Sequence, residues 1–438
     1  MANININLKV DKNFSTAFKK VTEKYGEDFE YLNGFHESQM NFSDFIDGFV
    51  DKNVADVTID ANANASNKDI ASLLCEKGKS HDKLFAFNKI FYEMNKKYSL
   101  KTAREWLETE YNGGFYLHDA PSTTYKPYCY AYDITRLATE GLFFLKNYNA
   151  QPPKHLSTYF DDIIEYVSYM CNRSSGAVGL PNLLIWSFYF WKKDCENGYY
   201  IKNTDYYLKQ SFQKLIYRLN QPFLRVDQSS FTNVSIFDRN YVESLFGGVI
   251  FPDGTMVIDC IEEIIEHQKA FMDVVSEIRS ENMFTFPVLT YSLLFKDGKF
   301  VDEDFARWCS DHNTTWNDSN FFVSDNVGTL SNCCRLLSDT TKLDAFINSI
   351  GGTALSIGSV KVNTTNLMRI YYETGADEEK YLELLRHRIE LCCKTLDCVR
   401  HIIQRNIEKG LLPNYCDGGM EMSKQYNTVG ILGLYEVI

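Results

Sequence analysis

The segment IGGTALSIGSVKVNTTNLMRI, residues 350–370, carries the clearest fold signal in the chain. VKVNTTNL is typical of a strand, and we expect glycine turns at Gly351-Gly352 and at Gly358 to bracket the backbone that precedes it. Backbone rich in glycine can approach a phosphate or a ribose closely. Asparagine is a poor strand former, so Asn363 and Asn366 indicate hydrogen bonding more than packing. The segment predicts a strand that borders a ligand.

Outward from this strand, helical patterns alternate with short strands, which favours the α/β class. We expect helices within 67–111, 155–220, 260–280 and 377–409, and strands at FYLHD (115–119), FTNVSIF (231–237) and MFTFPVLTY (283–291). Residues 1–55 are polar and aperiodic, and are expected to form a peripheral extension. Because the remainder has no repeat and no flexible linker, we expect one continuous domain over 56–438.

Composition excludes several classes of protein. The 438 residues carry 45 basic and 58 acidic side chains, a net charge of −13, which disfavours binding to nucleic acid or acidic membranes. The N-terminus lacks the layout of a signal peptide, and no apolar run is long enough to span a membrane, so we expect a cytoplasmic protein. Twelve cysteines in that compartment are mostly reduced and buried.

Common catalytic motifs are absent. The sequence has no GxxxxGK[ST], no HExxH, no GxSxG and no GxGxxG after a strand, which argues against P-loop, zincin, hydrolase and Rossmann chemistry. The histidines have no metal-ligand spacing, and Cys392, Cys393 and Cys398 have a spacing that suits a helix better than a zinc site.

Two cysteine segments remain as candidates for chemistry. In SDNVGTLSNCCRLLSD (324–339), Cys333 and Cys334 are either two buried thiols or a loop tip that presents one sulfur to a cavity. In GGFYLHDAPSTTYKPYCYAYD (113–133), Cys129 is either a core residue or part of an aromatic-walled pocket. Composition alone favours the buried alternative in both places.

Taken in order, the motifs resemble those of the anaerobic (class III) ribonucleoside-triphosphate reductases, which are glycyl radical enzymes. The resemblance extends over residues 55–438. Its motifs are IDANANASNK (59–68), GGFYLHDA (113–120), YCYAYD (128–133), QPPKHL (151–156), SSGAVGLPN (174–182), QSSFTNVSIFD (228–238), TFPVLTY (285–291), NCCRLLSD (332–339), GSVKVNTTNLMRI (358–370) and SKQYNTVGILGLYE (423–436).

The resemblance implies a ten-stranded α/β barrel of two antiparallel five-stranded halves, with a central finger loop and surrounding helices. It makes Cys334 the thiyl-radical cysteine that abstracts hydrogen from C3′ of the ribonucleotide, and Cys129 the cysteine that supplies hydrogen at the C2′ face. It makes Asn366 and Ser359 candidates for holding the ribose or its departing 2′-hydroxyl. The candidate substrate-binding residues are Ser359, Asn363 and Gly358, and Cys333 is a packing residue or a redox helper. No metal ligand is expected.

The resemblance also implies cofactors and partners. The family carries its radical glycine in an RVxGY-like segment preceded by a four-cysteine zinc site, and residues 1–438 contain neither. We therefore expect a separate polypeptide to supply the glycyl radical, as in a split gene, an intein- or intron-interrupted product, or a truncation. A radical activase with S-adenosylmethionine and a [4Fe-4S] cluster, a dNTP or ATP effector and a homodimer are further expectations. The first 55 residues are too short for an ATP-cone, and the reductant is either formate or a thioredoxin- or glutaredoxin-like protein.

Three alternatives stay open. Another glycyl radical enzyme would share the barrel and the cysteine pair, but it would lack YCYAYD and TNLMRI. A cobalamin-dependent reductase would work without the radical segment, although its motifs fit less well. From a different class, the chain is a catalytically inactive nucleotide-binding or assembly fragment.

Overall fold

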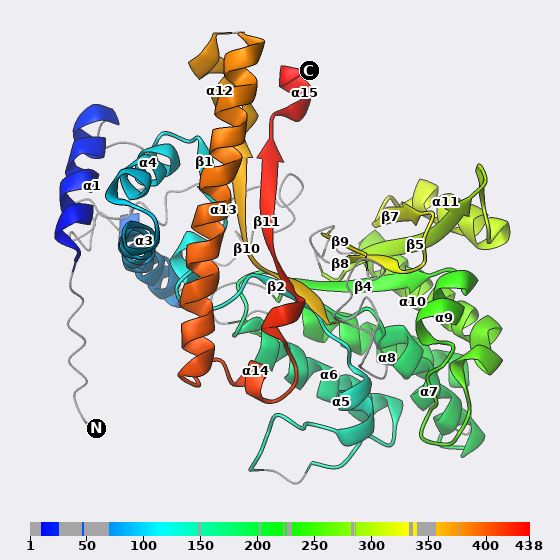
Figure 1. Cartoon of the computed structure of the whole chain (residues 1–438). Coiled ribbons are helices and arrows are strands. Elements are labelled where there is room, and N and C mark those ends of the chain that lie inside the picture. The colour runs from blue at the N-terminus through cyan, green and yellow to red at the C-terminus, as the bar shows by residue number, and fades with distance from the viewer. Residues whose placement is uncertain are drawn as a thin grey trace.

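The computed structural model describes residues 10–25, 46–47, 70–147, 150–200, 203–221, 224–225, 230–281, 284, 286–332, 336–339, 356–375 and 377–438. Within these residues a nine-stranded sheet curls through the molecule, with helices around it (Figure 1). Its strands are β1 (Phe115–Leu117), β2 (Cys129–Ala131), β3 (Val178–Gly179), β4 (Thr232–Phe237), β5 (Val288–Lys296), β6 (Lys299–Phe300), β7 (Ser319–Ser324), β10 (Ile357–Asn366) and β11 (Gln425–Leu432).

The strand directions divide this sheet into two parts. β2, β3, β4, β5 and β7 run parallel to one another in that spatial order, and β6 adds a short antiparallel partner at the end of β5. β10 runs antiparallel to β2 and β1 and parallel to β11. The mixed α/β class and the antiparallel junction agree with the expected barrel, and the parallel run forms one five-stranded half. The described residues give the sheet nine strands where ten were expected.

Two hydrophobic cores flank the sheet. The larger core fills the space between strands β2 to β5 and the helices at the lower right of Figure 1, and the smaller core lies between β1, β10 and the helices at the left. The helices around the larger core are α5 (Thr135–Glu140), α6 (Leu156–Cys171), α7 (Leu183–Glu196), α8 (Thr204–Leu219), α9 (Arg239–Phe246), α10 (Ile261–Glu281) and α11 (Glu303–Trp316).

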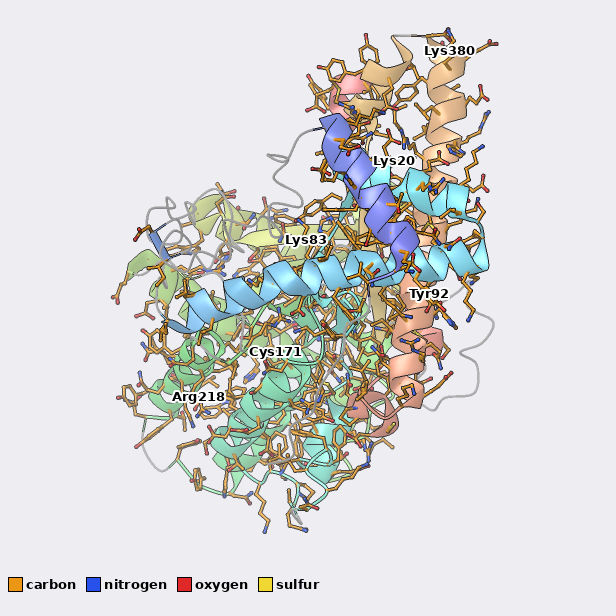
Figure 2. The ribbon with its side chains drawn as sticks, turned by 90° about the vertical axis from the view of Figure 1, so that its left-hand side faces the viewer. Lys20, Lys83, Tyr92, Cys171, Arg218 and Lys380 are labelled. Atoms are coloured by element: carbon orange, nitrogen blue, oxygen red, sulfur yellow. The ribbon has the colours of Figure 1, made fainter. Side chains whose placement is uncertain are left out.

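The smaller core holds the N-terminal helices together with the longest helix. Its members are α1 (Lys12–Tyr25), α3 (Ile70–Lys97), α4 (Leu100–Tyr111) and α13 (Glu378–Glu408). Figure 2 shows α1 above α3, and Phe14, Ala17 and Val21 of α1 are buried in this core. The expectation of aperiodic sequence before residue 55 is therefore wrong at α1, whereas the domain boundary at that residue stays a prediction.

Local chemistry explains where several elements begin. Ser99 and Asp377 accept hydrogen bonds from backbone amides in the first turns of α4 and α13, as N-cap residues do. Asn366 does the same for α12 (Leu367–Thr374), at the end of β10. The remaining short helices are α14 (Pro413–Cys416) and α15 (Leu434–Val437). None of the helices in the described ranges is both long and apolar enough to cross a membrane.

A separate hairpin lies beside the parallel half of the sheet. β8 (Thr329–Asn332) pairs antiparallel with β9 (Leu336–Asp339), and β8 contacts β5 and β7. Asn332 is opposite Leu336, so residues 333–335 connect the two strands in the sequence. The predictions for Cys333 and Cys334, like the glycine turn at Gly351-Gly352, lie outside the described residues.

Candidate active site

Cys129 lies where the two parts of the sheet meet. It is the first residue of β2, it is 1% exposed, and β2 pairs antiparallel with β10 on one side and parallel with β3 on the other. Cys129 is opposite Ser359 in the register of β2 and β10, so paired positions bring these two predicted residues together. The prediction that both border one site is consistent with this register.

Two glycines bring backbone unusually close to Cys129. A Cβ atom at Gly358 would lie 2.2 Å from the carbonyl oxygen of Cys129, and one at Gly176 would lie 3.2 Å from the Cys129 Cβ. The predicted turn at Gly358 is wrong, because Gly358 is an interior residue of β10 opposite Tyr130. The glycine is required there for close packing of two strands, which is the other common reason for glycine inside a strand.

Ser359 is fully buried and its hydroxyl already has partners. Its Oγ donates to the carbonyl oxygen of Lys361 at 3.1 Å and lies 2.8 Å from Thr428 Oγ1 of β11. β10 has a bulge between Ser359 and Lys361 where it pairs with β11, which bends the strand beside Cys129. The hydroxyl therefore holds β10 to β11 next to the cysteine.

Asn363 and Asn366, the two asparagines of β10, lie in different surroundings. Asn366 caps α12, because its Oδ1 accepts from the Arg369 amide at 3.1 Å while its Nδ2 donates to the Gly113 carbonyl at 3.1 Å. Asn363 is fully buried on the side of β10 that α13 covers, and neither polar atom of its side chain has a hydrogen-bond partner within the described residues. The structure thus gives Asn366 a capping role, and ribose contacts of either asparagine stay predictions.

A buried lysine next to this site was not predicted. Lys361 is fully buried, and its Nζ donates to the Asp119 carbonyl at 3.0 Å and lies 5.7 Å from the centre of the Tyr128 ring. Burial away from water lowers the pKa of Lys361 to about 7. A lysine inside a strand pattern normally indicates an exposed face, so no sequence signal marks it.

His118 is a second polar residue that sequence reasoning did not select. Its Nε2 lies 2.9 Å from Thr364 Oγ1 of β10, and its ring packs edge-on against Tyr116 and Tyr128. Its place inside the GGFYLHDA motif was the available signal. His118 and Lys361 both fix the segment after β1 to β10, on the approach to Cys129.

A different buried polar group lies between α4, β10 and α13. Glu110 of α4 is fully buried, its Oε1 accepts from Trp106 Nε1 at 3.2 Å, and its Oε2 has no hydrogen-bond partner in the described residues. Burial raises the pKa of Glu110 to about 8, so this carboxyl is largely protonated at neutral pH. Cys392 of α13 donates to the Asn363 carbonyl at 3.5 Å in the same region. Asn363 is therefore near Cys392 and Glu110.

Among the described residues, no three His, Cys, Asp or Glu side chains lie together in a way that could hold a metal ion. The chemistry available beside β2 is that of a buried thiol held between backbone segments. A thiol in such a place is shielded from water.

Comparison with known proteins identifies the family of the chain. A family model described as anaerobic ribonucleoside-triphosphate reductase matches residues 79–438. The crystal structure of the anaerobic ribonucleotide reductase from Thermotoga maritima in complex with dATP and CTP is similar, with 39% identity over 99% of this chain and 69% of that chain and a TM-score of 0.85. The structure of that enzyme with glycerol in the active site has 40% identity over 99% of this chain and 68% of that chain, with a TM-score of 0.84.

A further solved structure, described as an anaerobic ribonucleotide reductase, has 40% identity over all of this chain and 67% of that chain, with a TM-score of 0.85. The search of curated proteins found no match. The family model matches well over half of the residues, and the fold agrees with the solved enzymes. The chain therefore belongs to the anaerobic ribonucleoside-triphosphate reductase family.

Proposed function

We propose that this chain forms the barrel of a reductase that converts ribonucleoside triphosphates to 2′-deoxyribonucleoside triphosphates by thiyl-radical chemistry. The observation that supports this most is the setting of Cys129, a buried thiol on β2 with close glycine backbone from Gly358 of β10 and from Gly176 in the loop before β3. A hydrogen-donating thiol needs a fixed position and exclusion of water, and this setting provides both.

The two cysteines would have complementary roles. Cys334, as a thiyl radical, takes the hydrogen atom from C3′ of the substrate, and Cys129 supplies hydrogen at C2′ when the 2′-hydroxyl leaves. The position of β8 and β9 supports the first role, because Cys334 lies in the sequence between these two paired strands, and β8 contacts β5 and β7 of the parallel half of the sheet. Cys333 is either a packing neighbour or a redox helper in this scheme.

The substrate-binding proposals differ in their support. Ser359 and Gly358 lie in β10 opposite Cys129 and Tyr130, so a ribose facing Cys129 would also face this part of β10. Asn366 has less support, because its amide already caps α12 and bonds to Gly113. Asn363 lies beside Cys392, and its role in substrate binding has the least support.

A glycyl radical is the oxidising group that this chemistry requires. The two glycines near the end of the chain have structural explanations: a Cβ at Gly430 of β11 would lie 2.2 Å from Thr364 Oγ1, and Gly433, which precedes α15, has a φ of +80°. We therefore propose a radical glycine outside residues 1–438, installed by an activase that uses S-adenosylmethionine and a [4Fe-4S] cluster. A dNTP or ATP effector, a homodimer, and formate or a thioredoxin- or glutaredoxin-like reductant complete the proposal.

Turnover assays of the complete, radical-activated enzyme test the proposal. Wild type should convert ribonucleoside triphosphates to deoxyribonucleotides without oxygen. Cys334→Ser should abolish turnover, and Cys333→Ser should have a milder effect. Equal loss from both variants would refute the assignment of Cys334, and nucleotide binding without any turnover by an activated wild-type enzyme would favour an inactive nucleotide-binding fragment.

A further inference from the structure

Arg225 is a buried arginine that contacts one short loop. It is 1% exposed, and all four hydrogen bonds described for its guanidinium go to backbone carbonyls. Nε donates to Cys171 at 2.8 Å, Nη1 donates to Ser175 at 3.1 Å, and Nη2 donates to Ser174 at 3.2 Å and to Gly176. A buried charge is costly unless it is hydrogen-bonded, so these bonds are required for Arg225 to occupy this place. The consequence is a rigid connection between Arg225 and residues 171–176.

The same loop is hydrogen-bonded to the segment that leads into Cys129. The Ser175 amide donates to the Pro127 carbonyl at 2.9 Å, and the Gly176 amide donates to the Tyr128 carbonyl at 2.6 Å. Two successive peptide groups therefore accept from Arg225 through their oxygens and donate toward β2 through their N–H groups. A charged donor strengthens each bond in such a chain, because it polarises the peptide between them.

Steric contact makes this connection sensitive to small movements. A Cβ at Gly176 would lie 3.0 Å from the Tyr128 carbonyl oxygen and 3.2 Å from the Cys129 Cβ. The loop is thus in direct contact with the backbone that carries the thiol, with no side chain between them. Movement of the loop by about 1 Å is enough to change reaction rates about 100-fold when a reacting group is displaced.

We propose that Arg225 is a positioning residue, which holds the Cys129 thiol in place through the peptide groups of residues 174–176. The inference rests on the proposed function, because it concerns the hydrogen donor of that reaction. Arg225 itself does not touch Cys129 in this scheme. Its charge acts on the loop, and the loop fixes the start of β2.

The fold has other attachments that keep the loop in place without Arg225. The Asn172 Nδ2 donates to the Leu224 carbonyl at 3.0 Å, and the Ser174 hydroxyl donates to the Met170 carbonyl at 3.1 Å. Cys171 is the last residue of α6, whose apolar face is buried in the larger core. Figure 2 shows Cys171 below α3. Substitution of Arg225 should therefore loosen the loop locally and leave the surrounding helices folded.

Kinetics of the complete, radical-activated reductase provide the first test. For Arg225→Gln we expect kcat per radical to fall about 100-fold while KM for the ribonucleotide changes less than about threefold. Arg225→Lys keeps a charged donor, so its kcat should be about tenfold higher than that of Arg225→Gln. Arg279→Gln is the control, since Arg279 is a partly buried arginine, 16% exposed at its side chain, that donates to the carbonyls of Asp318 and Pro287, both at 3.0 Å, and also pairs with the Asp318 carboxylate. It should keep kcat within about threefold of wild type.

Amide hydrogen exchange of residues 1–438 provides a second readout that does not need activity. Exchange of residues 127–131 and 174–178 should be faster in Arg225→Gln and Arg225→Lys than in wild type, and unchanged in Arg279→Gln. Unchanged kcat in an active enzyme, or a loss that only follows the folded fraction, would overturn the positioning role, as would unchanged exchange at 127–131. Absence of ribonucleotide reduction by the wild type would instead contradict the proposed function. If Arg225→Gln does not fold, kcat and amide exchange are measured on Arg225→Lys, and the same results support or overturn the proposal.

Discussion

Two buried cysteines on either side of β10 show what separates a structural thiol from a candidate catalytic one. Cys129 on β2 and Cys392 on α13 are 1% and 0% exposed, so burial does not distinguish them. Cys392 belongs to the smaller core, where its thiol donates to the Asn363 carbonyl, and burial raises the pKa of this thiol. Cys129 instead has glycine backbone against it from two neighbouring segments.

This difference concerns how firmly each sulfur is placed. Cys392 is packed by side chains of the smaller core, and a core of this kind tolerates a residue of similar volume best. At Cys129 the neighbours are main-chain atoms of β10 and of the loop before β3, which cannot move without disturbing the sheet. Fixed backbone neighbours are therefore a better mark of the site than burial.

The largest expected effect separates the two thiols directly. In the complete, activated reductase, Cys129→Ser should lower turnover more than about 1,000-fold, because the hydroxyl is a poor hydrogen-atom donor at the same place. Cys392→Ser should keep turnover within about threefold and lower the free energy of unfolding by about 1 to 2 kcal/mol. Turnover assays and chemical denaturation measure the two quantities. Equal losses of turnover would remove the distinction between the thiols.

The next effect tests the backbone contact at Cys129. In Gly358→Ala the added methyl group would lie 2.2 Å from the Cys129 carbonyl oxygen, so the two strands must separate. We expect the free energy of unfolding to fall by about 3 kcal/mol, at the upper end for overpacked sites. Chemical denaturation measures this, and Gly248→Ala is the control, because a Cβ there meets no atom within 4 Å. Similar stability of the two variants would mean that β2 and β10 tolerate wider spacing.

The last comparison concerns the charge of Lys361, which lies in β10 two residues beyond Ser359, and its effect is a change of stability with pH. Burial lowers the pKa of Lys361 from its ordinary 10.5 to about 7, so between these pH values the unfolded chain binds more protons than the folded one. Through this group, the free energy of unfolding of the protein therefore rises with pH across that window. The limiting slope is about 1.4 kcal/mol per pH unit. Below pH 7 the cost of burying the charge is present in full.

Lys361→Met should remove this contribution. We expect the variant to be more stable than wild type at pH 6, with the difference shrinking as pH rises toward 9 in chemical denaturation experiments. Lys20→Met on the exposed face of α1 is the matched control for the loss of a lysine. A difference that stays constant with pH would show that Lys361 keeps its charge throughout.

Much of the architecture was predictable from local pattern. The helices α4, α10 and α13 and the strands β1, β4 and β10 lie where periodicity placed them, because each covers one stripe or face with apolar residues. Cys392, Cys393 and Cys398 lie on α13, as their spacing predicted. The turn at Gly358 was predicted wrongly, because a glycine needed for close strand packing looks the same in sequence as one needed for a turn.

The sequence by itself determined the family and the α/β class, since ordered motifs and periodicity are properties of the chain alone, and it made Cys129 a candidate through the resemblance of its motif. Only the tertiary structure decided that Ser359 is opposite Cys129, that Asn363 lies beside Cys392, and that Arg225 reaches the carbonyls of residues 171–176. These relations join residues tens to hundreds of positions apart. They depend on strand register and on which groups the fold removes from water, and neither is encoded in a local pattern.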